Sequence, residues 1–232
     1  MTNTAPRKLL TFSYDDGIFQ DIRLIRLLEK YGMRGTFHIC SGLLGESGEL
    51  IREGVTVGYG KIPKNEIKSV YQGHEVSAHT VTHKRLTELS DTEIIREVED
   101  DRAWLSELVG YEVCGLAYPF GARDERVMSL IRNNTGVRYA RTSGTSRGFG
   151  MPSDMLALSP SARHYTDEHW RDLFTLGERF ISLNPESDAH LCVMGHAYEF
   201  DIHNTWDKFE SFLKMMAGHA DITYATLSEA TL

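Results

Sequence analysis

Short apolar runs alternate along the chain with longer amphipathic segments. The runs have the length of β-strands, and they lie at residues 8–14, 35–40, 75–79, 114–118, 137–142, 155–159 and 190–196, with a weaker one at 222–226. Between most of them, apolar residues recur at helical spacing, as they do over 22–31 and 209–216. Ser90 and Glu93 have the spacing of a capping box and predict the start of a further helix. The pattern therefore predicts repeated strand–helix units.

Strands separated by helices pair in parallel through right-handed crossovers. Seven or eight such units favour a closed or nearly closed α/β barrel over an open sheet, with functional groups at the carboxyl ends of the strands. One glycine-rich stretch, 41–62, is longer than an ordinary connection. We interpret it as a substrate-facing loop, with a small hairpin as the alternative.

Composition narrows the class of protein. The 232 residues are 41% hydrophobic and 25% charged, which suits one domain spanning residues 1–232. The formal net charge of −8 offers no basic surface for a phosphate backbone, so we expect no nucleic-acid partner. There is neither a run of about 20 apolar residues nor a secretory signal. We accordingly expect no membrane partner and a cytoplasmic protein, or a secreted one if a leader has been removed.

Polar residues gather where the predicted strands end. These residues are Asp15, Asp16, His79, His83 and His196. Two histidines four residues apart in HTVTH face one side if the segment turns helically. Together with one carboxylate they provide the ligands of a catalytic zinc site that keeps one position open. Adjacent residues of a strand point to opposite faces, so Asp15 and Asp16 need separate partners.

Four motifs resemble those of a known family. SYDDG at 13–17, SAHTVTH at 77–83, AYPFG at 117–121 and VMGH at 193–196 are similar, in order, to the motifs of the polysaccharide deacetylase family, which has the NodB homology domain and is also called carbohydrate esterase family 4. The resemblance implies a distorted (β/α) barrel of seven or eight strands. It also implies a hydrolase that uses a metal-bound water to remove acetyl groups from an N-acetylated or O-acetylated sugar or glycan.

The resemblance further implies a role for each matching residue. Asp16, His79 and His83 correspond to the metal ligands. The metal is usually zinc, although the ligand set also tolerates cobalt, nickel or manganese. Asp15 corresponds to the general base and His196 to the general acid. The backbone N–H of Phe120 corresponds to the donor that stabilises the oxyanion.

The sequence departs from the family pattern in two places. Ala117 stands where the family commonly has an arginine that contacts the catalytic aspartate, and we expect Arg163 to supply that cation. The family's fourth motif, an aspartate and tryptophan pair that helps to set the pKa of the acid, has no clear counterpart, and Asp154 is one candidate for its aspartate. Aromatic residues that could stack on a sugar ring are Tyr59, Tyr118, Phe120, Tyr198 and Trp206.

Two alternative functions stay open. The first is hydrolysis of a small amide or cyclic ureide on the same fold, suggested by the lack of an export signal. The second is a non-catalytic glycan-binding protein that kept the metal ligands, suggested by the missing arginine. Release of acetate distinguishes the deacetylase from both.

Overall fold

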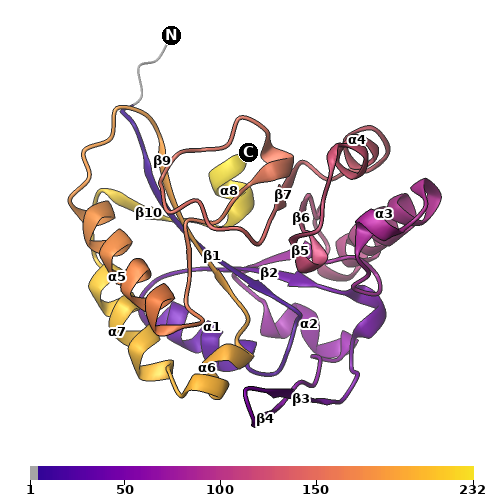
Figure 1. The fold of residues 1–232 in the computed structure, drawn as a ribbon, viewed down its shortest axis with the longest axis horizontal. Helices are drawn as coiled ribbons and strands as arrows, with labels where there is room; N and C mark the ends of the chain where they lie inside the picture. The colour runs from indigo at the N-terminus through magenta and orange to yellow at the C-terminus, as the bar shows by residue number, and fades with distance from the viewer. Residues whose placement is uncertain (1–4) are drawn as a thin grey trace.

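The central element is one parallel sheet, which curls into a half-barrel (Figure 1). It is seen in a computed structural model that describes residues 5–232. Its strands are β1 (Lys8–Asp15), β2 (Thr36–Ile39), β5 (Glu75–Ala78), β6 (Gly115–Ala117), β7 (Tyr139–Arg141), β8 (Ala162–Arg163), β9 (Ala189–Gly195) and β10 (Ile222–Tyr224). The order is β7-β6-β5-β2-β1-β9-β8, and β10 also pairs with β1. The predicted distorted barrel of seven or eight strands is confirmed.

Strand β1 forms the centre of this sheet. All eight of its residues are buried, because it pairs with β9 along one side and shares its other side between two strands. Its first half pairs with β10, from Lys8 to Leu10, and its second half with β2, from Ser13 to Asp15. The carboxyl end of β1 therefore lies between β2 and β9, where groups from both sides of the sheet meet.

Helices flank the sheet on both sides. They are α1 (Asp21–Lys30), α2 (Lys64–Val70), α3 (Asp91–Val109), α4 (Glu125–Asn134), α5 (Asp167–Ile181), α6 (Tyr198–His203), α7 (Trp206–Met216) and α8 (Leu227–Thr231). In Figure 1, α1, α5 and α7 lie on one flank of the sheet and α3 with α4 on the other. The predicted capping box is present at the start of α3. Within residues 5–232, the helices are all too short or too polar to cross a bilayer.

The strand predicted at 155–159 is wrong. Met155–Ala157 form a 3₁₀ turn, η4, and Leu158 makes only one parallel bridge, to Arg141 of β7. Pro160 follows two residues later and has no N–H to continue a ladder. The chain then enters β8, which pairs with β9 on the other side of the sheet. This segment thus spans the gap between the sheet edges and brings the half-barrel close to closure.

The stretch 41–62 contains the small hairpin that was the alternative to a substrate-facing loop. After a short 3₁₀ turn, η1 (Ser41–Leu43), strands β3 (Glu49–Arg52) and β4 (Val55–Gly58) pair antiparallel. The two turn residues, Glu53 and Gly54, have φ of 53° and 77°, as a type I′ hairpin turn requires. Strand β4 packs against α6, so the hairpin lies beside the carboxyl ends of β1 and β9.

Candidate active site

The polar residues predicted at strand ends surround one cavity of about 180 Å³. Asp15 ends β1, His79 follows β5, and His196 follows β9. All five predicted residues line the cavity. Its further lining residues are Arg52, Tyr59, Tyr118, Phe120, Gly121, Arg141, Ser143, Met194 and Tyr198. Four of the five predicted aromatic candidates are among them, while Trp206 is buried elsewhere.

Asp16, His79 and His83 form a group that fits a metal ion. Their ligand atoms lie within 4.8 Å of one another. Oδ1 of Asp16 is 3.9 Å from Nε2 of His79 and 3.8 Å from Nε2 of His83. Two ligand atoms about 2.1 Å from one ion in tetrahedral geometry stand about 3.4 Å apart. The group therefore needs little adjustment to hold zinc.

Both histidines are held in the form that a metal requires. Nδ1 of His79 lies 2.7 Å from the carbonyl oxygen of Ala117. A carbonyl only accepts, so Nδ1 carries the proton and Nε2 is left with its lone pair directed at Asp16. Burial lowers the pKa of His79, and burial together with His79 lowers the pKa of His83 to about 4. Neutral imidazoles are the ligating species.

The backbone of this site adopts uncommon conformations. Asp16, Thr80, His83 and Phe120 have φ of 87°, 68°, 56° and 60°. Such left-handed conformations of residues other than glycine cost of order 1–3 kcal/mol each and persist where the surroundings impose them. Three of the four are residues whose roles were predicted from the motifs. Their concentration here supports a functional rather than a structural purpose for the local fold.

The hairpin supplies the partners of Asp16. Tyr59 donates a 2.6 Å hydrogen bond from its hydroxyl to Oδ2, so Oδ1 is the oxygen that faces the histidines. Nζ of Lys61 lies 3.7 Å from Oδ1, and the lysine side chain is only 6% exposed. Burial raises the pKa of Asp16, but the charges of His196 and Lys61 outweigh it and lower that pKa overall. Asp16 is thus fixed as an anion.

Asp15 has a different partner, Arg141. This arginine is buried, and its Nη2 donates to Oδ1 of Asp15 while Nη1 donates to the carbonyl of Thr142 at 3.0 Å. Burial raises the pKa of Asp15, but Arg141 outweighs it and holds that pKa well below its usual range. Arg141 ends β7 and stands in register with Ala117 of β6. The arginine missing at position 117 is therefore replaced from the neighbouring strand.

The prediction that Arg163 orients Asp15 is wrong. Nη2 of Arg163 lies 3.5 Å from Oε1 of Glu199. Arg163 is in β8, which pairs with β9 at the opposite end of the sheet from β7. Its side chain accordingly reaches α6 rather than the end of β1. Among the described residues, Glu199 is the carboxylate that connects Arg163 to the site.

His196 is paired with Glu199, a residue that the sequence analysis missed. Nδ1 of His196 is 3.1 Å from Oε1 of Glu199, and its Nε2 is 3.9 Å from Oδ2 of Asp15. Burial lowers the pKa of His196, but the hydrogen bond and charge of Glu199 outweigh it and raise that pKa to about 9. Asp154, the candidate for this carboxylate, is instead half-buried and lies beside Arg132, 2.6 Å away. The signal that identifies Glu199 is its spacing of three residues from His196 at the start of a helix.

Phe120 presents both its ring and its backbone to the cavity. The residue is 58% exposed, and its ring packs edge-on against His83, with 4.8 Å between the ring centroids. Within residues 5–232 its backbone N–H donates to no protein acceptor. The left-handed conformation thus leaves one N–H available to a bound oxygen atom.

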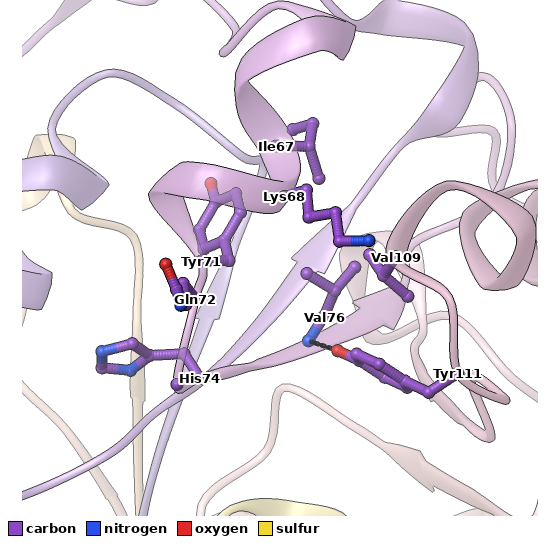
Figure 2. A pocket seen from close by; sticks show the side chains of 9 residues that line it. Ile67, Lys68, Tyr71, Gln72, His74, Val76, Val109 and Tyr111 are labelled. Atoms are coloured by element: carbon purple, nitrogen blue, oxygen red, sulfur yellow. Dashed lines mark hydrogen bonds between the residues drawn. The ribbon is translucent and has the colours of Figure 1, made fainter.

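A second cavity lies at the amino end of β5, away from His79 at the carboxyl end (Figure 2). It is bordered by Tyr71, His74, Val76 and Tyr111, and the hydroxyl of Tyr111 accepts a hydrogen bond from the backbone N–H of Val76 at 2.8 Å. None of the predicted site residues lines this second cavity. The chemistry therefore belongs to the cavity around Asp15 and Asp16.

Comparison with known proteins agrees with this geometry. A family model described as polysaccharide deacetylase matches residues 2–140. The chain belongs to the polysaccharide deacetylase family. The matched residues include Asp15, Asp16, His79, His83 and Phe120. The match ends just before Arg141, and His196 and Glu199 lie beyond it.

Individual relatives are distant. YheN of Bacillus subtilis, by name a polysaccharide deacetylase, is 24% identical over 128 residues, which are 54% of this chain and 40% of YheN. A bifunctional xylanase/deacetylase of Pseudobutyrivibrio xylanivorans is 25% identical over 113 residues, 48% of this chain and 16% of that protein. The chain thus spans less than half the length of these relatives.

Solved structures share the fold at lower identity. A polysaccharide deacetylase-like protein of Mycobacterium smegmatis superposes with a TM-score of 0.68 at 13% identity, covering 100% of this chain and 91% of the other. A mutant of BA3943, a CE4 family pseudoenzyme with restored enzymatic activity, gives 0.59 at 14% identity, covering 99% and 69%. The fold therefore occurs both with and without activity, and the site residues must carry any functional argument.

Glu199→Gln is expected to shift the alkaline limb of the pH–activity profile to lower pH. The histidine must be protonated to act as an acid, and loss of the glutamate charge lowers the pKa of His196 from about 9. Profiles of kcat/KM against pH for both proteins measure the shift. Glu97→Gln, a change at a buried carboxylate bound to Thr82 rather than to His196, should leave this limb in place. An unmoved limb in Glu199→Gln would contradict the pairing.

Proposed function

We propose that residues 1–232 form one polysaccharide deacetylase domain that hydrolyses an acetyl group from an N-acetylated or O-acetylated sugar or glycan. The observation that carries the proposal is the division of two adjacent carboxylates between different partners. Asp16 faces two neutral histidines, whereas Asp15 is paired with Arg141 and lies 3.9 Å from His196. One strand end thus provides a metal ligand and a separate base.

In this proposal Asp16, His79 and His83 hold a divalent metal, with zinc the first candidate and cobalt, nickel or manganese as others. When bound, the metal polarises the acetyl carbonyl and acidifies the attacking water. Three of the chain's residues provide the rest of the chemistry. Asp15, Phe120 and His196 surround the same cavity.

Asp15 takes the proton of the attacking water. Its pKa is held low by Arg141, so it is in the required anionic form. The Phe120 N–H donates to the oxyanion that develops on the acetyl group. His196 donates a proton to the departing nitrogen or oxygen, and Glu199 keeps it protonated at neutral pH. Tyr59, Tyr118, Phe120 and Tyr198 offer ring surface to the sugar.

Neither alternative function gains support from the structure. The glycan-binding alternative depended on a missing arginine, and Arg141 now fills that place. For a ureide or small amide, the cavity offers no feature that favours it over an acetylated sugar.

The test combines two measurements on one preparation. Elemental analysis should find close to one divalent metal per chain, and a panel of acetylated monosaccharides and glycans should yield acetate from at least one member. Removal of the metal by a chelator should abolish acetate release, and zinc should restore it. A metal-loaded protein that releases no acetate from any member, but hydrolyses an amide or ureide or binds a glycan unchanged, would overturn the proposal.

Replacing the 41–62 stretch with a short turn is expected to leave the chain folded and to alter substrate affinity. The hairpin contributes Arg52 and Tyr59 to the cavity, while its strands are mostly exposed. Because Tyr59 and Lys61 also hold Asp16, a second variant should shorten only 49–58 and retain both. Circular dichroism checks the fold and steady-state kinetics give KM. Unchanged KM in both variants would exclude a role for the hairpin in binding.

A further inference from the structure

Charged side chains around the cavity are almost all matched by a partner. Asp15 pairs with Arg141, and Lys61 lies 3.7 Å from Asp16. His196 is likewise bound to a carboxylate, at 3.1 Å. Arg52 is the exception, because within residues 5–232 no carboxylate oxygen lies within 4.0 Å of its guanidinium nitrogens although it lines the same cavity. Among the described residues, Arg52 is thus a cation beside the substrate space with no carboxylate at ion-pair distance.

The hairpin holds Arg52 in this place from several sides. The guanidinium lies over the ring of Tyr198, 5.6 Å from its centroid. The neighbouring residue, Glu53, accepts a 2.7 Å hydrogen bond from the hydroxyl of Tyr165. At the base of the hairpin, the side chain of Gln20 donates to the carbonyl of Gly58 at 2.8 Å. Anchored at its turn and at its base, the hairpin presents Arg52 at the mouth of the cavity.

A guanidinium in this position suits a particular ligand chemistry. Its planar donors match the two oxygens of a carboxylate or phosphate, and such charge-assisted pairs are stronger than neutral hydrogen bonds. The cavity of about 180 Å³ is smaller than the roughly 300–1,000 Å³ of pockets that enclose drug-sized ligands. It therefore encloses little beyond the acetyl group and its sugar, and a substituent of that sugar meets Arg52 at the mouth.

We propose that Arg52 selects an acetylated sugar that carries an anionic substituent, a carboxylate or a phosphate, close to the acetyl group. This inference rests on the proposed function, since it names the substrate class of the same site. It concerns specificity alone, because Arg52 contacts none of Asp15, Asp16 or His196. The chain as a whole carries a net charge of −8, so this local cation is needed to hold an anionic sugar.

The test compares matched substrates. N-Acetylglucosamine serves as the neutral member, its 6-phosphate as the phosphate member and N-acetylmuramic acid as the carboxylate member. The wild-type protein should favour one anionic member over the neutral one by about 10-fold or more in kcat/KM. Arg52→Gln should lose that preference through a higher KM for the anionic member. Arg52→Lys should retain part of the preference. Comparison of the phosphate and carboxylate members shows which anionic group Arg52 binds.

Arg26→Gln is the matched control, because Arg26 is exposed on α1 and does not line the cavity. It removes the same charge and should leave the preference unchanged. Equal kcat/KM for all three sugars in the wild type, or an unchanged preference in Arg52→Gln, would overturn the inference.

Failure of the proposed function is distinguishable from failure of this inference. If no sugar releases acetate, titration calorimetry of the same three sugars still measures whether wild-type protein binds an anionic member more tightly than the neutral one and whether Arg52→Gln loses that difference. Binding without a difference would overturn the role of Arg52, whereas a difference that Arg52→Gln abolishes would support it.

Discussion

Asp15→Asn is expected to lower turnover by on the order of 10²–10⁴ while the protein keeps its metal. This range is the usual contribution of a positioned general base. An amide cannot take the proton of the attacking water, although it has nearly the same shape as the carboxylate. The three predicted metal ligands do not include this residue, so metal content should stay at the wild-type level.

Asp16→Asn should lose its metal, and lose activity as a consequence. Loss of the anionic ligand leaves two neutral histidines, which cannot balance a divalent ion, so metal occupancy should fall and activity with it. Elemental analysis and acetate release on both variants measure the contrast. Added metal should raise the melting temperature of Asp15→Asn much more than that of Asp16→Asn, since only a bound ligand stabilises the fold. Equal metal content in the two variants, or loss from Asp15→Asn alone, would show the two roles to be assigned wrongly.

Much of the fold was predictable because burial leaves a strong pattern in parallel sheets. Strand β1 is apolar over most of its length since both of its faces are covered, and the predicted range 8–14 is one residue shorter than the observed strand. The run at 155–159 has the same apolar character and is not a strand. Periodicity does not distinguish a short strand from a buried turn, and only the pairing partner decides between them.

The five strand-end residues were predictable for a related reason. Parallel strands all point the same way, so polar residues that follow them meet at one edge of the sheet. The role of Arg141 was not predicted in this way, although Arg141 also ends a strand. Its relation to Ala117 depends on the register between β6 and β7, which neither strand's sequence contains. The choice of Arg163 failed because β8 lies at the other end of the sheet.

The contribution of the hairpin was the hardest part to predict. Tyr59 reaches Asp16 across 43 residues of sequence, and Lys61 does so from the same segment. A glycine-rich stretch offers no periodic pattern that fixes which side chains point into a site. The pairing of Glu199 with His196 could have been predicted. A carboxylate three residues after a histidine at the start of a helix is within reach of the imidazole ring.

Arg141→Ala is expected to move the acid limb of the pH–activity profile to higher pH and to lower turnover at neutral pH. Without the guanidinium, Asp15 loses the largest of the charges that oppose the effect of burial, so its pKa rises and the base becomes protonated and inactive at a pH where the wild type still works. Breaking a buried ion pair also costs about 3–5 kcal/mol of stability. Chemical denaturation and metal analysis should accompany the profiles, so that only folded, metal-loaded protein is compared.

The register between β6 and β7 offers a more direct test of the same arginine. Ala117→Arg combined with Arg141→Ala moves the cation one strand across, to a position about 4.8 Å away on the same face of the sheet. If the cation acts by orienting and ionising Asp15, the double variant should recover part of the turnover and return the acid limb toward the wild-type pH. Ala117→Arg alone, which crowds two cations beside one carboxylate, should not gain activity. A double variant as stable as Arg141→Ala, with an acid limb equally displaced, would instead make Arg141 a structural residue whose contact with Asp15 has no part in the reaction.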